Sequence, residues 1–322
     1  MELACGFSSK ATLDSRYKRV RRFFKDFTIS FPLVACWVVQ FFGLTEQRLY
    51  LSMDRTNWRW GTKNINILML SIVHKGIAIP LFRSLLDKRG NSNTDERIAI
   101  LERFIAQFGK NKIAGLLADR EFVGNVWFGW LLKKRIPFCI RVKSNTITTN
   151  ALGLDVNVDS LFYDLKAGEY RVLQNKRKFW QQHVYLSALR LADGELLIVA
   201  TDQLMQDPIQ HYAKRWEIET LFACLKSKGF NFEDTHVTHP ERIEKRLALL
   251  TIAFCWAYKT REWRHEKKPI TIKKHSRKAF SLFSYGLDFL RDIVLNGVQQ
   301  ANELLSDIVG FLIMGAVTGN KT

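Results

Sequence analysis

The chain has 322 residues, of which 47% are hydrophobic and 25% are charged. At about 150 residues per domain, this length predicts roughly two domains, and the composition excludes a disordered chain, a collagen-like chain and a small disulfide scaffold. The 49 lysines and arginines outnumber the 31 aspartates and glutamates by 18. The expected partner is therefore a polyanion, with nucleic acid first and an acidic membrane surface second.

Residues 1–45 are expected to form a short, helical, basic N-terminal segment. Residues 10–26 hold seven basic and two acidic residues, a pattern that fits either a solvated helix face or a DNA-contacting one. Residues 27–44 carry no charge, but Pro32, Gln40 and the short length argue against a membrane span. We therefore expect no membrane partner.

Residues 46–144 alternate between strand and helix patterns. Three consecutive runs rich in β-branched and aliphatic residues predict a meander, and the following amphipathic helix has Thr94 as its expected cap. The expected strands are 48–56, 64–73, 77–82, 112–119 and 137–144, and the expected helices are 94–109 and 124–135. The later strand–helix–strand alternation is typical of an α/β fold with parallel central strands.

In the rest of the chain the sequence pattern changes twice. Residues 145–205 show alternating patterns with little helical period, which predicts a β-rich insertion. Residues 206–262 return to helical patterns, and residues 263–322 read as a basic helical C-terminal region. Between residues 259 and 278 there are nine basic residues, which favour contact with a DNA backbone or a merely soluble face about equally.

Two aspartates follow apolar strand patterns. Asp54 is expected at the end of the first strand, in LSMDRT, and Asp119 ends a later buried strand, in LLADREF. Ligands of α/β sheets bind at the carboxyl ends of strands, and two carboxylates brought together there repel each other unless a cation intervenes. Each aspartate taken alone also fits an ordinary strand-end cap or ion-pair partner.

A third group of polar residues lies on the helix expected from residue 207 onward. At about 100° per residue, Tyr212, Arg215, Glu219 and Lys226 fall within an arc of about 60°, beside an apolar stripe that would pack on the sheet. The same pattern fits a solvated face with ion pairs.

The spacing Tyr212-x2-Arg215-x3-Glu219-x6-Lys226 resembles the YREK signature of the DDE transposases of the bacterial insertion sequence 4 family. The segments LSMDRT and LLADREFVG look like the surroundings of that family's first and second aspartates. Three separated motifs thus occur in the family's order, and the resemblance covers roughly residues 45–260.

The resemblance implies an RNase H-like mixed sheet flanked by helices, in two core segments (46–144 and 206–262) separated by the β-rich insertion. Asp54, Asp119 and Glu219 would be the catalytic residues and would hold two Mg²⁺ ions, with Mn²⁺ as a substitute. Tyr212, Arg215 and Lys226 would bind DNA phosphates near the cut.

The activity implied is metal-dependent cleavage of transposon ends and strand transfer into target DNA, by cut-and-paste. The implied partner is double-stranded DNA, bound by a homodimer in a synaptic complex in the bacterial cytoplasm, at the nucleoid. Only 53 residues precede Asp54, where such transposases generally carry a helical DNA-end recognition domain. An alternative is therefore a shortened, catalytically idle DNA-binding protein or dominant-negative regulator of a full-length transposase. A third option is a basic protein at a membrane surface.

Overall fold

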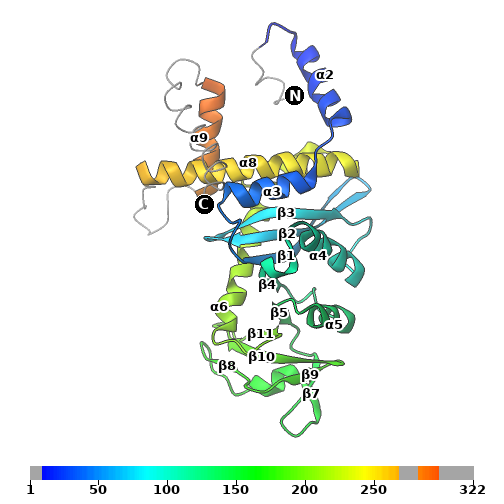
Figure 1. Ribbon diagram of the computed structural model, residues 1–322, viewed down its shortest axis with the longest axis vertical. Helices are drawn as coiled ribbons and strands as arrows, with labels where there is room; N and C mark the ends of the chain where they lie inside the picture. The colour runs from blue at the N-terminus through cyan, green and yellow to red at the C-terminus, as the bar shows by residue number, and fades with distance from the viewer. Residues whose placement is uncertain (1–8, 268–281, 297–322) are drawn as a thin grey trace. The chain divides into compact units, whose positions relative to one another are not determined.

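The computed structural model describes residues 9–267 and 282–296 (Figure 1). The α-helices are α2 (Leu13–Asp26), α3 (Phe31–Phe41), α4 (Thr94–Phe108), α5 (Asn125–Lys134), α6 (Pro208–Ala213), α7 (Glu217–Lys226), α8 (Pro240–Lys267) and α9 (Leu282–Asn296). The 3₁₀ helices are η1 (Lys110–Lys112), η2 (Val158–Phe162), η3 (Lys214–Trp216) and η4 (Phe232–Thr235). The strands are β1 (Leu49–Trp60), β2 (Lys63–His74), β3 (Ile77–Leu85), β4 (Ile113–Ala118), β5 (Phe138–Val142), β6 (Ile147–Thr149), β7 (Asp155–Asn157), β8 (Tyr170–Val172), β9 (Arg177–Phe179), β10 (Gln182–Arg190) and β11 (Leu196–Thr201).

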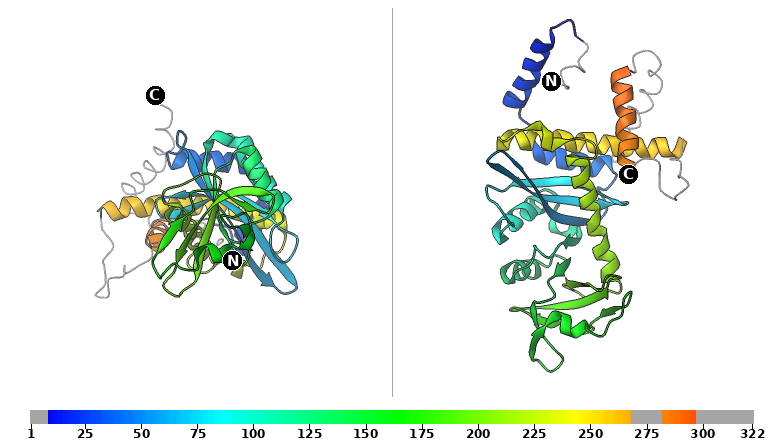
Figure 2. Two further views of the ribbon diagram at one scale, coloured as in Figure 1. Left: turned by 90° about the horizontal axis from the view of Figure 1, so that it is seen from below. Right: turned by 180° about the vertical axis from the view of Figure 1, so that it is seen from behind.

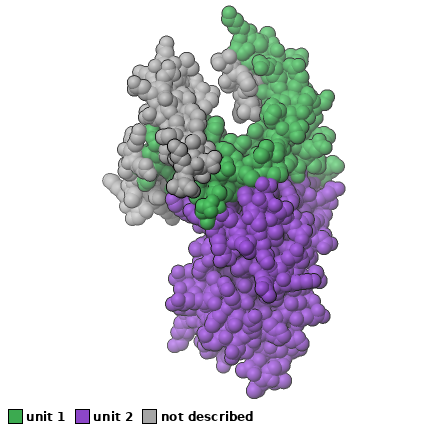
Figure 3. Space-filling view, in the orientation of Figure 1, with its two compact units in different colours: residues 1–46, 60–63, 222–322 green, residues 47–59, 64–221 purple. Residues whose placement is uncertain are grey.

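The chain divides into two compact units (Figure 3). One comprises residues 1–46, 60–63 and 222–322, and the other comprises residues 47–59 and 64–221. We call them the helical unit and the sheet unit. The domain boundaries expected from the sequence are not those of the two units, and they stay a prediction.

The sheet unit is a mixed α/β structure built on one large sheet. Its strand order is β3-β2-β1-β4-β5-β11-β10-β9-β6-β7, and β8 pairs with β10. The adjacent strands β1, β4 and β5 pair in parallel, as the strand–helix alternation predicts, whereas β11 joins β5 in antiparallel orientation. The predicted meander is confirmed by the order β3-β2-β1. Residues 145–205 contain β6 to β11, as the alternating pattern predicts.

Helices cover both faces of this sheet. Figures 1 and 2 show α4 and α5 on one face and α6 on the other. Because successive side chains of a strand point to opposite faces, Phe138 packs against Phe128 of α5, while Cys139 joins the core cluster that contains Tyr212 of α6. The short apolar strands therefore build two cores, one on each side.

The helix α4 starts one residue earlier than a Thr94 cap would require. Its N-cap is Asn93, whose Oδ1 accepts a hydrogen bond from the Glu96 amide at 2.9 Å, while Glu96 Oε2 accepts one from the Asn93 amide at 2.7 Å. Thr94 is already the first helical residue, so its expected role as cap was wrong. Asn and Thr both favour the cap position, and only the backbone bend distinguishes them.

Asn93→Ala is expected to lower the free energy of unfolding by about 1 kcal/mol, because it removes one partner of this reciprocal cap. Thr94→Ala is the matched control and should change it by only a few tenths of a kcal/mol, since alanine is a good helix former. Urea unfolding of both variants tests this. A larger loss for Thr94→Ala than for Asn93→Ala would contradict the assignment of the cap.

In the helical unit, α8 is the longest helix and contacts α2, α3 and α9. Lys245 Nζ donates to the carbonyls of Phe24 and Lys25 at the end of α2, at 3.2 and 3.0 Å. Gly286 lets α9 approach α8, since a Cβ there would overlap the carbonyl of Ala257. Within residues 9–267 and 282–296, no helix has both the length and the apolar character that a membrane span needs. Much of the predicted basic C-terminal region lies outside these residues.

Candidate active site

The first of the two aspartates lies inside a strand and not at its end. β1 continues past Asp54 to Trp60, so the expected strand end at this residue was wrong. What ends there is the pairing with β4, whose last matched residues are Met53 and Ala118. Asp54 and Asp119 are each the next residue after that pair. The parallel register therefore places both carboxylates side by side where β1 and β4 separate.

Burial changes the acidity of Asp54. The pKa of Asp54 is raised to about 6, chiefly by burial and to a smaller extent by the charges of Glu121 and Asp119. The amide of Arg55, which donates to Asp54 Oδ1 at 2.7 Å, and the guanidinium of Arg215 act in the opposite direction. The net shift is upward because the loss of hydration destabilises the charged carboxylate more than the Arg55 amide and the Arg215 guanidinium stabilise it.

The helix expected to follow residue 207 is interrupted. α6 ends at Ala213, a 3₁₀ turn covers Lys214–Trp216, and α7 starts at Glu217. Even so, Arg215 and Glu219 meet as an i,i+4 pair, as the helical spacing predicts. Arg215 lies in η3 and is buried.

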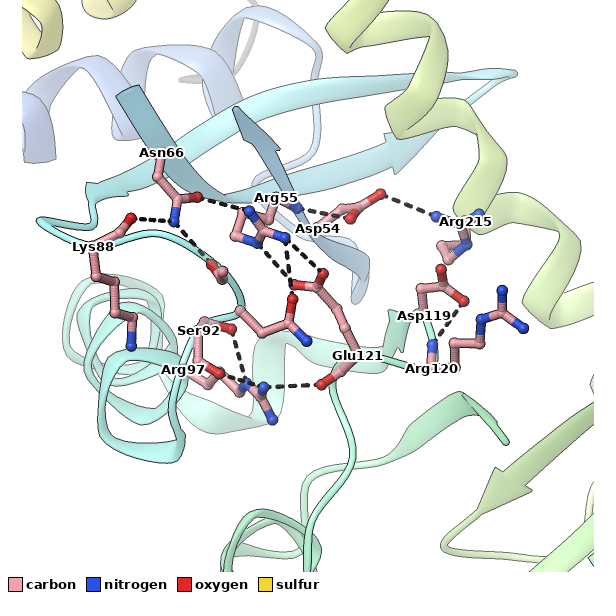
Figure 4. A network of polar contacts seen from close by, with 12 residues as sticks. Asp54, Arg55, Asn66, Lys88, Ser92, Arg97, Asp119, Arg120, Glu121 and Arg215 are labelled. Carbon is pink, nitrogen blue, oxygen red and sulfur yellow. Dashed lines mark hydrogen bonds and ion pairs between the residues drawn. The ribbon is translucent and has the colours of Figure 1, made fainter. Parts of the chain in front are cut away.

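Arg215 links two of the predicted catalytic residues. Its Nη1 lies 3.0 Å from Asp54 Oδ2 and its Nη2 lies 2.6 Å from Glu219 Oε1. The Arg215 side chain is 5% exposed, against 16% for Asp54 and 58% for Glu219. Figure 4 shows Arg215 beside both aspartates. The structure thus joins Asp54 to Glu219 through a buried guanidinium.

Tyr212 completes the cluster from α6. Its ring is fully buried, and its hydroxyl donates a long hydrogen bond of 3.4 Å to Asp119 Oδ1. Burial of Tyr212 raises its pKa, so the hydroxyl keeps its proton and remains a donor. Tyr212 and Arg215 are both buried in this arrangement, and their contact with DNA stays a prediction.

Lys226 belongs to a different compact unit from these residues. It is the last residue of α7 and belongs to the helical unit, where its Nζ pairs with Glu233 Oε1 at 3.0 Å. The structure therefore gathers Asp54, Asp119, Tyr212, Arg215 and Glu219 in the sheet unit. The predicted contact of Lys226 with DNA stays a prediction.

The donor atoms suit a hard cation. Carboxylate oxygens are the ligands that Mg²⁺ prefers, and the repulsion between the two neighbouring aspartates is relieved when a divalent ion binds. Among the described residues, no three acidic, histidine or cysteine side chains gather into a metal-binding group. At this site Glu219 is paired with Arg215 at 2.6 Å. The donor chemistry of Asp54 and Asp119 suits a divalent ion.

Two further residues of the site were not predicted. Glu121 pairs with Arg55, whereas its sequence neighbour Arg120 lies 3.6 Å from Glu195. The available clue was that a basic residue directly follows Asp54 while an acidic one comes two residues after Asp119. That clue becomes informative only when the two segments are known to be neighbours.

A cavity of about 270 Å³ lies in the sheet unit, and one of its lining residues, Arg120, directly follows Asp119. Its lining includes the side chains of Arg120, Arg141 and Arg190, and Glu195 pairs with Arg141 at 2.5 Å. The lining also includes Asp159, so three guanidinium groups face two carboxylates, and Glu195 pairs with both Arg141 and Arg120.

Glu217, at the start of α7, has a strongly shifted acidity. Burial raises its pKa to about 7, while the charge of Lys214 and the backbone amides of Gly76 and His74 lower it. The folded protein thus retains this proton up to about pH 7, whereas the unfolded chain releases it near the ordinary value of 4.5. Between these two pH values the folded state binds more protons, so the contribution of Glu217 to stability falls as the pH rises.

Glu217→Gln is expected to remove that slope. The difference in melting temperature, variant minus unsubstituted protein, should become more positive from pH 5 to pH 8. The reason is that glutamine carries no charge to desolvate. Thermal unfolding across this range tests the prediction, with Glu195→Gln as a control for a half-exposed carboxylate. Parallel pH curves for Glu217→Gln and the unsubstituted protein would contradict it.

These features define a mixed α/β protein with a buried carboxylate site at its parallel strands. The chain belongs to the transposase DDE domain family, whose match covers residues 53–256. That range includes the two aspartates and the whole of α6, η3 and α7.

Similarity to solved structures is weaker. The chain is 11% identical to a piggyBac transposase in a synaptic complex with hairpin DNA, with a TM-score of 0.41, over 83% of this chain and 57% of that one. It is 13% identical to the catalytic domain of human Endonuclease V, with a TM-score of 0.28, over 79% of this chain and 96% of that one. The chain thus spans little more than half of the piggyBac chain. No curated protein sequence matches it.

Proposed function

We propose that this protein is a DNA transposase that cleaves transposon ends and joins them to target DNA, as a YREK-type member of the insertion sequence 4 family. The observation that carries the proposal is the placement of Asp54 and Asp119 side by side, with Glu219 joined through Arg215, in a chain of the transposase DDE domain family. The core would be an RNase H-like sheet formed by residues 46–144 and 206–262, interrupted by residues 145–205.

In this proposal Asp54, Asp119 and Glu219 hold two Mg²⁺ ions, for which Mn²⁺ substitutes. When bound, such ions activate the attacking water or 3'-hydroxyl and stabilise the leaving oxygen of the phosphodiester. Asp54 and Asp119 supply hard oxygen ligands from fixed strand positions. Glu219 is 58% exposed and can turn toward the aspartates when Arg215 releases it.

Arg215 and Tyr212 act next to these ligands. The Arg215 guanidinium balances the charges of Asp54 and Glu219 before metal binds, and once displaced it is positioned to grip two oxygens of a DNA phosphate. Tyr212 holds Asp119 through its hydroxyl. Direct contact of Tyr212, Arg215 and Lys226 with DNA phosphates remains part of the proposal, and for Tyr212 and Arg215 it requires a rearrangement on binding.

Double-stranded DNA is the proposed substrate, bound by a homodimer that brings two transposon ends together at the bacterial nucleoid. The net charge of +18 supports a polyanionic partner. Cut-and-paste transposition is the proposed route.

The test uses a supercoiled plasmid that carries the gene's own flanking DNA, incubated with purified protein and Mg²⁺, Mn²⁺ or EDTA. Cuts that need the metal ion, fall at the element's ends and disappear in Glu219→Gln are the expected result. Binding without cutting under either metal ion would overturn the proposal in favour of a catalytically idle regulator of a full-length transposase.

A further inference from the structure

Beyond the carboxylates themselves, the site is bordered by an ion pair that joins its two aspartate-bearing segments. Arg55 donates from Nε to Glu121 Oε1 and from Nη2 to Glu121 Oε2, both at 3.3 Å (Figure 4). The two side chains are only 13% and 20% exposed. A two-pronged guanidinium–carboxylate pair that is shielded from solvent has a defined geometry, unlike a single surface contact.

Further hydrogen bonds hold Arg55 in place. The Nη1 of Arg55 also donates to Asn66 Oδ1 at 3.1 Å, and Asn66, itself 2% exposed, donates to the carbonyls of Lys88 and Gly90 at 3.0 Å each. Asn66 lies in β2, the neighbour of β1. Arg55 is therefore held against the sheet and the loop that precedes α4.

The segment of Glu121 is clamped separately. Arg97 of α4, which is 5% exposed, donates to the backbone carbonyl of Glu121 at 2.9 Å and to that of Val123 at 3.3 Å. Its Nε donates to Ser92 Oγ at 2.9 Å. The turn that follows Asp119 is thus fixed to α4 through its backbone, with the carboxylate of Glu121 directed at Arg55.

The position of the pair explains what it does. Backbone pairing between β1 and β4 ends at Met53 and Ala118, immediately before the two aspartates. Beyond that point, the Arg55–Glu121 contact joins the segments across 66 residues of sequence. We propose that Arg55 and Glu121 are positioning residues that hold Asp54 and Asp119 at the separation needed to bind a divalent ion, an inference that rests on the proposed function.

The route from the pair to the site is short. Asp54 Oδ1 accepts the amide hydrogen of Arg55 at 2.7 Å, so a shift in the backbone of Arg55 moves that carboxylate. Asp119 Oδ1 accepts the amide hydrogen of Arg120 at 2.7 Å, one residue before Glu121. Ligand groups must stay within about 0.5 Å of the productive geometry, and loss of an outer partner typically costs about 10- to 100-fold in metal affinity or activity.

The test compares Arg55→Gln, Glu121→Gln and the double variant of the full chain. We expect each single variant to weaken Mn²⁺ binding, measured by electron paramagnetic resonance of free Mn²⁺, by about 10-fold, and to slow plasmid cleavage by about 10- to 100-fold. The double variant should be no worse than the more impaired single one, because both remove the same contact. Arg55→Lys retains the positive charge but loses the two-pronged geometry. Its Mn²⁺ affinity and cleavage rate should lie between those of the unsubstituted protein and those of Arg55→Gln.

The matched control is Asp164→Asn. It breaks a second two-pronged arginine–carboxylate pair of the sheet unit, in which Arg171 donates to Asp164 at 2.8 and 2.7 Å, and should leave Mn²⁺ affinity and cleavage unchanged. Thermal unfolding of every variant separates positioning from stability. Mn²⁺ affinity of folded Glu121→Gln equal to that of the unsubstituted protein would overturn the inference.

Failure of the proposed function would look different. If the unsubstituted protein binds Mn²⁺ but cuts no DNA, the transposase proposal fails while the Mn²⁺ affinities still decide the role of the pair. If the unsubstituted protein binds no Mn²⁺, both proposals are overturned. If it binds and cuts but the Arg55 and Glu121 variants match it, only the positioning role is overturned.

Discussion

Asp54→Asn and Asp119→Asn are each expected to reduce cleavage of transposon-end DNA by about 10³-fold or more, the scale on which loss of one charge-stabilising group in an enclosed site acts. Asparagine keeps the shape of each side chain and an oxygen that can accept from the next backbone amide, at Arg55 or Arg120. It loses the negative charge that binds a cation. Cleavage of labelled end DNA under Mg²⁺, followed over time, measures the effect.

DNA binding by the same variants is the control. Electrophoretic mobility shifts should give DNA affinities close to that of the unsubstituted protein, since neither negatively charged aspartate is expected to bind DNA directly. Glu219→Gln should behave in the same way. Loss of binding in all three variants would point to misfolding or to a wrong site, and retained cleavage in Asp54→Asn or Asp119→Asn would refute the catalytic assignment.

Arg215→Met is expected to lower the free energy of unfolding by about 3 kcal/mol in EDTA. Methionine replaces the buried stem but leaves Asp54, which is 16% exposed, without its counter-charge. The half-exposed Glu219 adds little, because water screens its pairing. A divalent ion can replace the lost positive charge, so Mn²⁺ should raise the melting temperature of Arg215→Met more than that of the unsubstituted protein.

Arg120→Met provides the comparison for Arg215→Met. The Arg120 side chain is 54% exposed and its partner Glu195 is 3.6 Å away, so its loss should change stability by less than about 0.5 kcal/mol. Chemical unfolding with and without Mn²⁺ measures both variants. If Arg215→Met instead unfolds like the unsubstituted protein and loses only DNA affinity, Arg215 is a direct phosphate contact and the charge-balancing role is wrong.

Much of the fold could be predicted because its determinants are local. The apolar runs of β1 to β5 and the three- and four-residue spacing of α4 are readable from residues close in sequence, and so is the β-rich texture of residues 145–205. The neighbourhood of Asp54 and Asp119 was also predicted, although its physical basis is the end of the parallel pairing of β1 with β4 and not the end of β1.

The errors share a different cause. Whether Asn93 or Thr94 caps α4 depends on one backbone bend, which periodicity could not reveal. The 3₁₀ turn at Lys214–Trp216 likewise leaves no trace in the spacing of apolar residues. Lys226 is a separate case: it ends α7 in the helical unit, and its contact with DNA stays a prediction.

By itself, the sequence determined which residue types could bind a hard cation and the strands and helix region that carry them. Tertiary structure decided what those residues do to one another. Arg215 reaches Asp54 across 161 residues and Arg55 reaches Glu121 across 66, contacts that exist only through the register of β1 with β4 and the burial of η3. Periodicity acts over a few residues, whereas the pairing of buried charges depends on which strands become neighbours, and that is a property of the whole fold.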